Sequence, residues 1–133
     1  MTDEKIREIF AQTKTIASVG LSSNPARPSF GVCKYLQSKG YRIIPVNPNE
    51  TEVLGEKSYP DLKSVPEKID LVQIFRKPEF VPAIVDDAIA VGAKVVWMQD
   101  GAGNPDAAAR AEAAGTVAVV DDCMMRQHRR LYR

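Results

Sequence analysis

A polar turn at residues 20–29 carries the residue types that bind anions. It begins at Gly20, directly after the apolar run 16–19, contains the cation Arg27, and ends where a helical pattern starts at Pro28. The first N–H groups of a helix have no partner inside it and lie at the positive end of the helix dipole. A phosphate placed there accepts their hydrogen bonds. The sequence therefore predicts an anion site between a strand and a helix.

The elements that position this turn follow from the spacing of apolar and turn-forming residues. Buried strands are expected at 15–19, 41–46, 69–75, 94–98 and 117–120. Helices are expected at 3–12, from Pro28 to the glycine at 40, from 78 to the glycine at 92, from 105 to the glycine at 115, and at 123–133. Residues 50–63 are expected to form a polar connection, with a short helical segment near 61–65.

Strand and helix segments that alternate in this way predict an α/β fold. Because crossovers between parallel strands are right-handed, we expect a doubly wound, Rossmann-like parallel sheet of about five strands with helices on both faces. A single domain over residues 1–133 is expected. Ligands of such sheets bind beyond the carboxyl ends of the strands, where strand order reverses. This rule selects the loops at 20–29, 47–50, 76–78, 99–103 and 121–124.

Composition limits the classes of partner. The net charge of +1 over 133 residues gives no general attraction to nucleic acid or to a membrane surface. No apolar run approaches the roughly 20 residues that span a bilayer, and the charged first residues contain no secretory signal. The two cysteines, Cys33 and Cys123, lack metal-ligand spacing. We therefore expect a cytoplasmic protein with reduced thiols and with no nucleic-acid, membrane or metal partner.

A dinucleotide is the first candidate for the anion. The glycine pattern G-x-G-x-x-G is absent, because Ser22 and Pro25 stand where its later glycines belong. The second strand is followed by Asn47 instead of the acidic residue that binds a ribose hydroxyl. Both departures oppose a nicotinamide cofactor, so an NAD(P)-binding oxidoreductase is kept only as an alternative.

Several segments of the chain stand in an order and spacing that are specific when taken together. They are Val19-Gly-Leu-Ser-Ser-Asn-Pro-Ala-Arg-Pro-Ser29, Val46-Asn-Pro48, Val65-Pro-Glu-Lys-Ile-Asp70, Phe75-Arg76, Gly92-Ala-Lys-Val-Val-Trp-Met-Gln99 and Cys123. The chain thereby resembles the small stand-alone CoA-binding proteins, which are related to the CoA-binding N-terminal domain of the succinyl-CoA synthetase alpha subunit. The resemblance covers nearly the whole chain and implies a Rossmann-like fold that binds coenzyme A or an acyl-CoA.

Carried over by position, the resemblance implies a ligand-binding role for thirteen residues. Those around the pyrophosphate are Gly20, Ser22, Asn24, Arg27 and Ser29, with Ser23 in the same turn. Those on the adenosine side are Asn47, Pro48, Phe75 and Arg76, and those at the pantetheine exit are Met98, Gln99 and Gly101.

The chemistry of the residues fits such a ligand. Coenzyme A carries a diphosphate and a 3′-phosphate, so its site needs helix N-termini together with cations. Arg27, Arg76 and Lys77 are the basic residues in the first three crevice loops. Asp100 departs from the pattern of the small CoA-binding proteins, and its carboxylate repels a nearby anion unless a cation pairs with it.

The residues give no sign of catalysis by this chain alone. No nucleophile–base pair, metal cluster or general acid–base pair is recognisable, and the phosphohistidine loop of the larger synthetase has no counterpart. We expect coenzyme A binding without independent enzyme activity. A CoA-binding subunit of an acyl-CoA ligase is the second alternative, and a homo-oligomer stays open. Cys33 is expected in the core, Trp97 in the core or at an interface, and the single histidine, His128, on the surface or in packing, whereas Cys123 is expected at the edge of the crevice.

Overall fold

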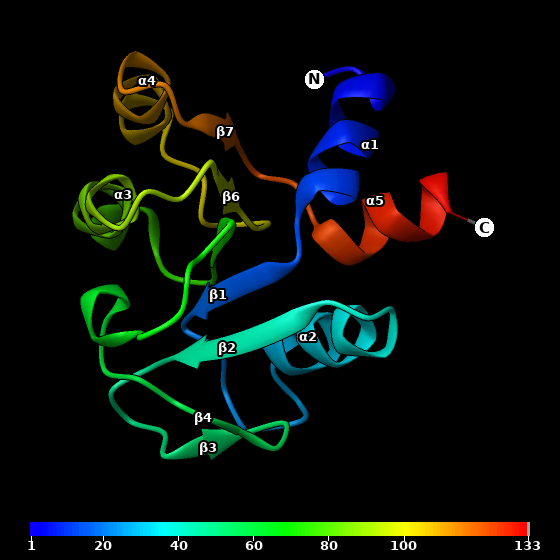
Figure 1. Cartoon of the computed structure of the whole chain (residues 1–133), viewed down its shortest axis with the longest axis vertical. Coiled ribbons are helices and arrows are strands. Elements are labelled where there is room, and N and C mark those ends of the chain that lie inside the picture. Colours follow the sequence, from blue (N-terminus) through cyan, green and yellow to red (C-terminus); the bar gives the residue numbers. More distant parts are fainter. Residues whose placement is uncertain (133) are drawn as a thin grey trace.

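The computed structural model describes residues 1–132 and has the predicted α/β architecture (Figure 1). Parallel strands form its main sheet: β1 (Thr15–Val19), β2 (Arg42–Val46), β5 (Leu71–Ile74), β6 (Val95–Met98) and β7 (Val117–Val119). Their order across the sheet is β2-β1-β5-β6-β7. The chain winds outward from β1 to β2, crosses back over β1 to β5, and then winds the other way. Strand order therefore reverses between β1 and β5, which is where open α/β sheets bind their ligands.

Helices cover both faces of the sheet. On one face lie α1 (Asp3–Gln12), α2 (Pro28–Ser38) and α5 (Met124–Leu131), and on the other lie α3 (Val81–Ala90) and α4 (Pro105–Ala113) (Figure 1). Alternate strand residues serve the two layers: Ile16 packs in the first layer and Ala17 in the second. Because both faces are covered, the strands are mostly apolar and do not alternate regularly with polar residues; Ser18 and Gln73 are buried polar exceptions. No helix within residues 1–132 is long and apolar enough to span a membrane.

The helices that flank the sheet begin differently. Thr2 accepts a hydrogen bond from the Lys5 N–H at 3.2 Å and caps α1, and Asn104 accepts one from the Ala107 N–H at 3.1 Å and caps α4. The start of α2 has Arg27 at the cap position and makes no side-chain cap bond. Since Ser, Thr, Asp and Asn are the residues that satisfy these N–H groups, the start of α2 stays open to another acceptor.

The segment expected to be a polar connection contains a small hairpin that was not predicted. Strands β3 (Glu52–Val53) and β4 (Glu56–Lys57) pair antiparallel through a turn at Leu54 and Gly55, both with positive φ. A 3₁₀ turn at Leu62–Ser64 confirms the short helical segment, and a second at Pro78–Phe80 leads into α3. The third strand is shorter than predicted at both ends, and the last helix ends at Leu131. Arg133, predicted to end that helix, lies outside the described residues.

Three residues that could serve either packing or chemistry are buried in the core. Trp97 is fully buried, and its Nε1–H donates to the Asp122 carbonyl at 2.9 Å. Cys33 is fully buried on α2. The ring of His128 stacks on Tyr132 and lies 2.8 Å, Nδ1 to hydroxyl oxygen, from Tyr35. Burial lowers the pKa of His128, so it stays neutral at pH 7 and serves packing, as expected.

Candidate functional site

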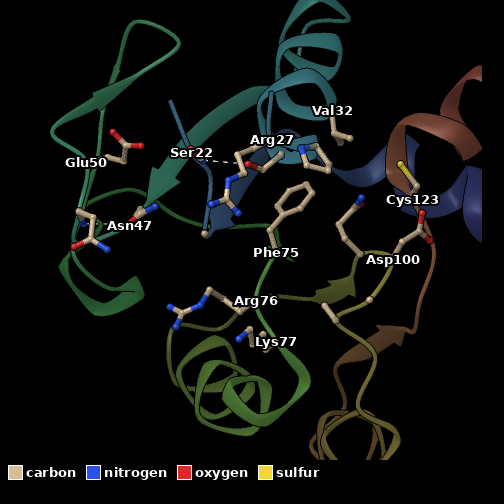
Figure 2. A pocket seen from close by; sticks show the side chains of 17 residues that line it. Ser22, Arg27, Val32, Asn47, Glu50, Phe75, Arg76, Lys77, Asp100 and Cys123 are labelled. Atoms are coloured by element: carbon tan, nitrogen blue, oxygen red, sulfur yellow. Dashed lines mark hydrogen bonds between the residues drawn. The ribbon is translucent and has the colours of Figure 1, made fainter. Parts of the chain in front are cut away.

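A pocket of about 640 Å³, here the central pocket, opens beyond the carboxyl ends of β1, β2, β5 and β6. Its walls come from the loops after these strands, the start of α2 and the loop before α5. Figure 2 shows Asn47 and Glu50 at one end, Asp100 and Cys123 at the other, and Arg27 and Phe75 between them. Nine of the predicted binding residues line it: Gly20, Ser22, Arg27, Ser29, Asn47, Phe75, Arg76, Gln99 and Gly101.

The start of α2 supplies unused donors to the central pocket. Pro28 has no N–H, and no acceptor for the Ser29 N–H is found among residues 1–132. The buried Ser29 hydroxyl accepts a hydrogen bond from the Ser22 N–H at 3.1 Å, so its own proton is left to donate (Figure 2). Arg27 adds an exposed guanidinium that makes no ion pair within the described chain. Donors of this kind, gathered at a helix N-terminus, suit an anion.

The carboxylate of Glu50 is hydrogen-bonded to the turn between β1 and α2. Glu50 Oε2 accepts a hydrogen bond from the Ser23 N–H at 2.7 Å, and the side chain lines the central pocket. Glu50 therefore supplies, four residues after β2, an acidic group that sequence reasoning looked for only at Asn47. A bound phosphate close to this carboxylate is repelled by it, whereas a ribose hydroxyl is not.

A buried hydrogen-bond network fixes Gln99 in the floor of the central pocket. The Met124 N–H donates to Gln99 Oε1 at 3.0 Å, and Gln73 Nε2 donates to the same oxygen at 3.3 Å. Gln73 in turn accepts from Ser18 and Cys33. Because a backbone N–H must face an acceptor, the amide orientation of Gln99 is set. Its Nε2 has no partner among the described residues and is left to donate to a ligand.

Asp100 and Asp121 are both held by partners of their own. Arg126 on α5 donates to both oxygens of Asp100, at 2.9 and 3.1 Å, and lowers the pKa of that carboxyl. Arg76 does not pair with Asp100; its guanidinium lies 4.5 Å from the ring centre of Phe80. Asp121 accepts from the N–H groups of Gly101 and Gly103 at 3.2 and 2.8 Å. Pairing thus screens the charge of Asp100 from an anion in the pocket.

Two further hollows adjoin the central pocket. A β2-side pocket of about 530 Å³ shares Gly20, Asn47, Asn49 and Arg76 with it, and its apolar walls include Pro48, Pro60, Leu62, Phe80 and Ile84. An α5-side groove of about 920 Å³ lies between the start of α2 and α5, with walls that include Pro25, Gly31, Met125, Arg126, Arg129 and Arg130. The three hollows thus adjoin one another through shared lining residues and are together called the channel here; the start of α2 lines two of them, the central pocket and the α5-side groove.

The remaining predicted residues lie elsewhere. The Ser23 N–H donates to Glu50 and the Asn24 N–H donates to the Ser22 hydroxyl, and neither residue lines the central pocket. Pro48 lies in the β2-side pocket. Met98 is fully buried in the layer of α3 and α4, because strand alternation turns it away from the crevice, so we leave it out of the site proposed below.

Sequence reasoning passed over several residues that line the central pocket. Glu50 and Asn49 lie in a loop that the strand-end rule had selected, but neither was singled out. Val32 lies three residues after Ser29 on α2, and residues three apart share a helix face. Its place in the pocket could therefore have been predicted from that of Ser29. Within residues 1–132, no group of three or more His, Cys, Asp or Glu side chains is placed to hold a metal ion.

The two thiols should differ sharply in reactivity. Burial raises the pKa of Cys33 to about 12, and its side chain is fully inaccessible, whereas Cys123 keeps 7% of its surface exposed and lines the central pocket. Because the thiolate is the reactive form, we expect Ellman's reagent to modify one thiol in the folded protein and two in urea. Cys123→Ser should remove the native reaction and Cys33→Ser should leave it intact. A native reaction that persists in Cys123→Ser would contradict this assignment.

Some known proteins are similar to this chain over nearly their whole length. A sequence model described as "CoA binding domain" matches residues 14–129. The "Uncharacterized protein YneT" of Bacillus subtilis is 39% identical over 124 residues, which are 93% of this chain and 92% of that protein. The structure of a hypothetical protein from Pyrococcus horikoshii OT3 matches with a TM-score of 0.97 and 47% identity, over 100% of this chain and 94% of the other.

A much longer enzyme is also similar over part of its length. "Acetate--CoA ligase [ADP-forming] II" of Archaeoglobus fulgidus is 30% identical over 91 residues, which are 67% of this chain but 13% of the ligase. The match to the family model extends over most of the chain, from the start of β1 into α5. This chain therefore belongs to the CoA binding domain family.

Proposed function

We propose that this protein binds coenzyme A or an acyl-CoA along the channel beyond β1, β5 and β6, without chemistry of its own. The observation that carries the proposal is the open start of α2, where the Ser29 N–H, the Ser29 hydroxyl and Arg27 face the central pocket. These are the donors that a diphosphate requires. Their place next to the reversal of strand order supports the same assignment.

The rest of the ligand follows from the two ends of the channel. The adenine ring suits the β2-side pocket, whose walls include Pro48, Leu62 and Phe80, with Arg76 on the border for a phosphate. The pantetheine arm suits the path past Phe75 and Gln99, whose Nε2 is placed to donate to an amide carbonyl. Cys123 then marks the thiol end. Apolar walls with a few fixed polar groups are typical of cofactor sites.

Two observations support binding without catalysis. The chain has one histidine, His128, and it is 8% exposed and packed against Phe10, Tyr35 and Tyr132. It therefore offers no accessible imidazole for phosphoryl transfer. The acetate–CoA ligase relative is also several times longer, since the matched region is 13% of it. A ligase role would require the parts of that enzyme that lie outside the matched region.

Titration calorimetry with coenzyme A tests the proposal. We expect a dissociation constant of about 1 µM or lower, which corresponds to roughly −8 kcal/mol. NADH serves as the comparison ligand, because Glu50 gives the pocket one feature of a nicotinamide site. We expect NADH to bind at least about tenfold more weakly, since it lacks the 3′-phosphate and the pantetheine arm. Absence of both heat and thermal shift with coenzyme A would refute the proposal, and tighter binding of NADH would favour an oxidoreductase.

A further inference from the structure

The α5-side groove continues the central pocket beyond the place assigned to the thiol. The two hollows share Arg27, Pro28, Val32, Asp100 and Cys123. Cys123 is thus a wall of both, so a group attached to a thiol near Cys123 lies at the border between the central pocket and the groove. The groove is therefore placed to hold the acyl group of an acyl-CoA.

The groove carries more positive charge than its own acidic partners neutralise. Four arginines and one carboxylate, Asp100, line it. Arg126 is bound to Asp100 and to Asp122, the latter at 2.8 Å. Arg130 is bound to Asp3 at 2.7 Å. Two cations thus have carboxylate partners inside the protein and contribute little to the attraction of a further anion.

The other two arginines, Arg27 and Arg129, make no ion pair with the described residues. Arg129 is exposed on α5, with its guanidinium 4.9 Å from the ring centre of Tyr35. Stacking on an aromatic face fixes the direction of a guanidinium and leaves its in-plane N–H groups for a carboxylate. Between the cations, Gly31, Val32 and Met125 supply walls without charge.

We propose that the α5-side groove binds the acyl group of an acyl-CoA whose far end carries a carboxylate, with Arg129 as the residue that recognises that carboxylate. The inference rests on the proposed function, because it places the thioester at Cys123. A short carbon chain matches the uncharged walls, and a terminal carboxylate matches the surplus positive charge. An acyl chain without a terminal carboxylate would leave the guanidinium of Arg129 beside hydrocarbon.

A matched pair of thioesters tests the inference by calorimetry. Glutaryl-CoA and valeryl-CoA have acyl chains of equal carbon number and differ at the terminal carboxylate. We expect wild-type protein to bind glutaryl-CoA at least about fivefold more tightly, as a partly exposed charge pair allows. Arg129→Gln should abolish the difference, Arg129→Lys should retain most of it, and Arg110→Gln on α4, outside all three hollows, should leave it unchanged.

The possible results separate the two proposals. Equal affinity for the two thioesters, tighter binding of valeryl-CoA, or a preference that survives in Arg129→Gln would overturn the inference, while coenzyme A binding would still stand. Failure of coenzyme A and both thioesters to bind would overturn the proposed function itself. Binding of a glutamate hexapeptide to the CoA-saturated protein, lost in Arg129→Gln, would assign the groove to an acidic protein segment and overturn the acyl assignment.

Discussion

Replacement of Gly20 by alanine is expected to lower the free energy of unfolding by about 2–5 kcal/mol. Gly20 has φ +91°, a region that costs a residue with a Cβ roughly 1–2 kcal/mol. A Cβ there would also lie 2.5 Å from the Phe75 carbonyl oxygen, which is backbone and cannot rotate away. Overlap of this kind costs about 1–3 kcal/mol more. Urea denaturation, compared through midpoint and slope, measures the loss.

Gly40 supplies a matched control for Gly20. Its φ is +96°, but a Cβ at this position would meet nothing within 4 Å. Gly40→Ala should therefore show the conformational cost alone, and the difference between the two variants isolates the close approach of the turn to Phe75. Equal losses in the two variants would show that this approach is unimportant. Because Gly20 and Phe75 both line the central pocket, the same contact sets how near the start of α2 lies to β5.

Arg27→Ala is expected to weaken coenzyme A binding by about 10- to 150-fold, with little change in folding stability. A hydrogen bond to a charged group contributes roughly 1.5–3 kcal/mol, which corresponds to that range of dissociation constants. Stability should hold because Arg27 is exposed and makes no ion pair within the described chain. Calorimetry gives the affinity, and urea denaturation checks the fold.

Glu50→Gln removes a negative charge where the Arg27 variant removes a positive one, so its effect on coenzyme A affinity should be opposite. Glutamine keeps an oxygen that accepts the Ser23 N–H but removes a negative charge from the central pocket. Coenzyme A should therefore bind more tightly to this variant than to wild type. Equal affinity of wild type and Arg27→Ala, or weaker binding by Glu50→Gln, would place the phosphates elsewhere in the channel.

Much of the fold is encoded locally and could be predicted for that reason. Each strand of the main sheet is a short apolar run ended by glycine or a polar turn, and the helices α1 and α4 begin at Thr2 and Asn104, which cap them. The strand-end rule then selected the crevice loops without knowledge of strand order. The Glu52–Lys57 hairpin escaped because its two-residue strands carry no periodicity, and Leu54 occupies a positive-φ position normally taken by Gly or Asn.

The site was predictable only where it depends on single loops. Gly20, Arg27 and Ser29 belong to one turn, and their place in the central pocket follows from the helix that they begin. The α5-side groove depends on the packing of α2 against α5, which are about 90 residues apart, so no local pattern indicates it.

The position of Asp121 has a mechanical consequence for the channel. Its carboxylate joins the N–H groups of Gly101 and Gly103, and a side chain at Gly103 would collide with it. A second tie, from Asp100 to Arg126, runs between the same two segments. The loop after β6 and the first turns of α5 are therefore coupled as one lever. The wall that Asp100 forms in the central pocket and the wall that Arg126 forms in the α5-side groove are thus parts of one hydrogen-bonded unit.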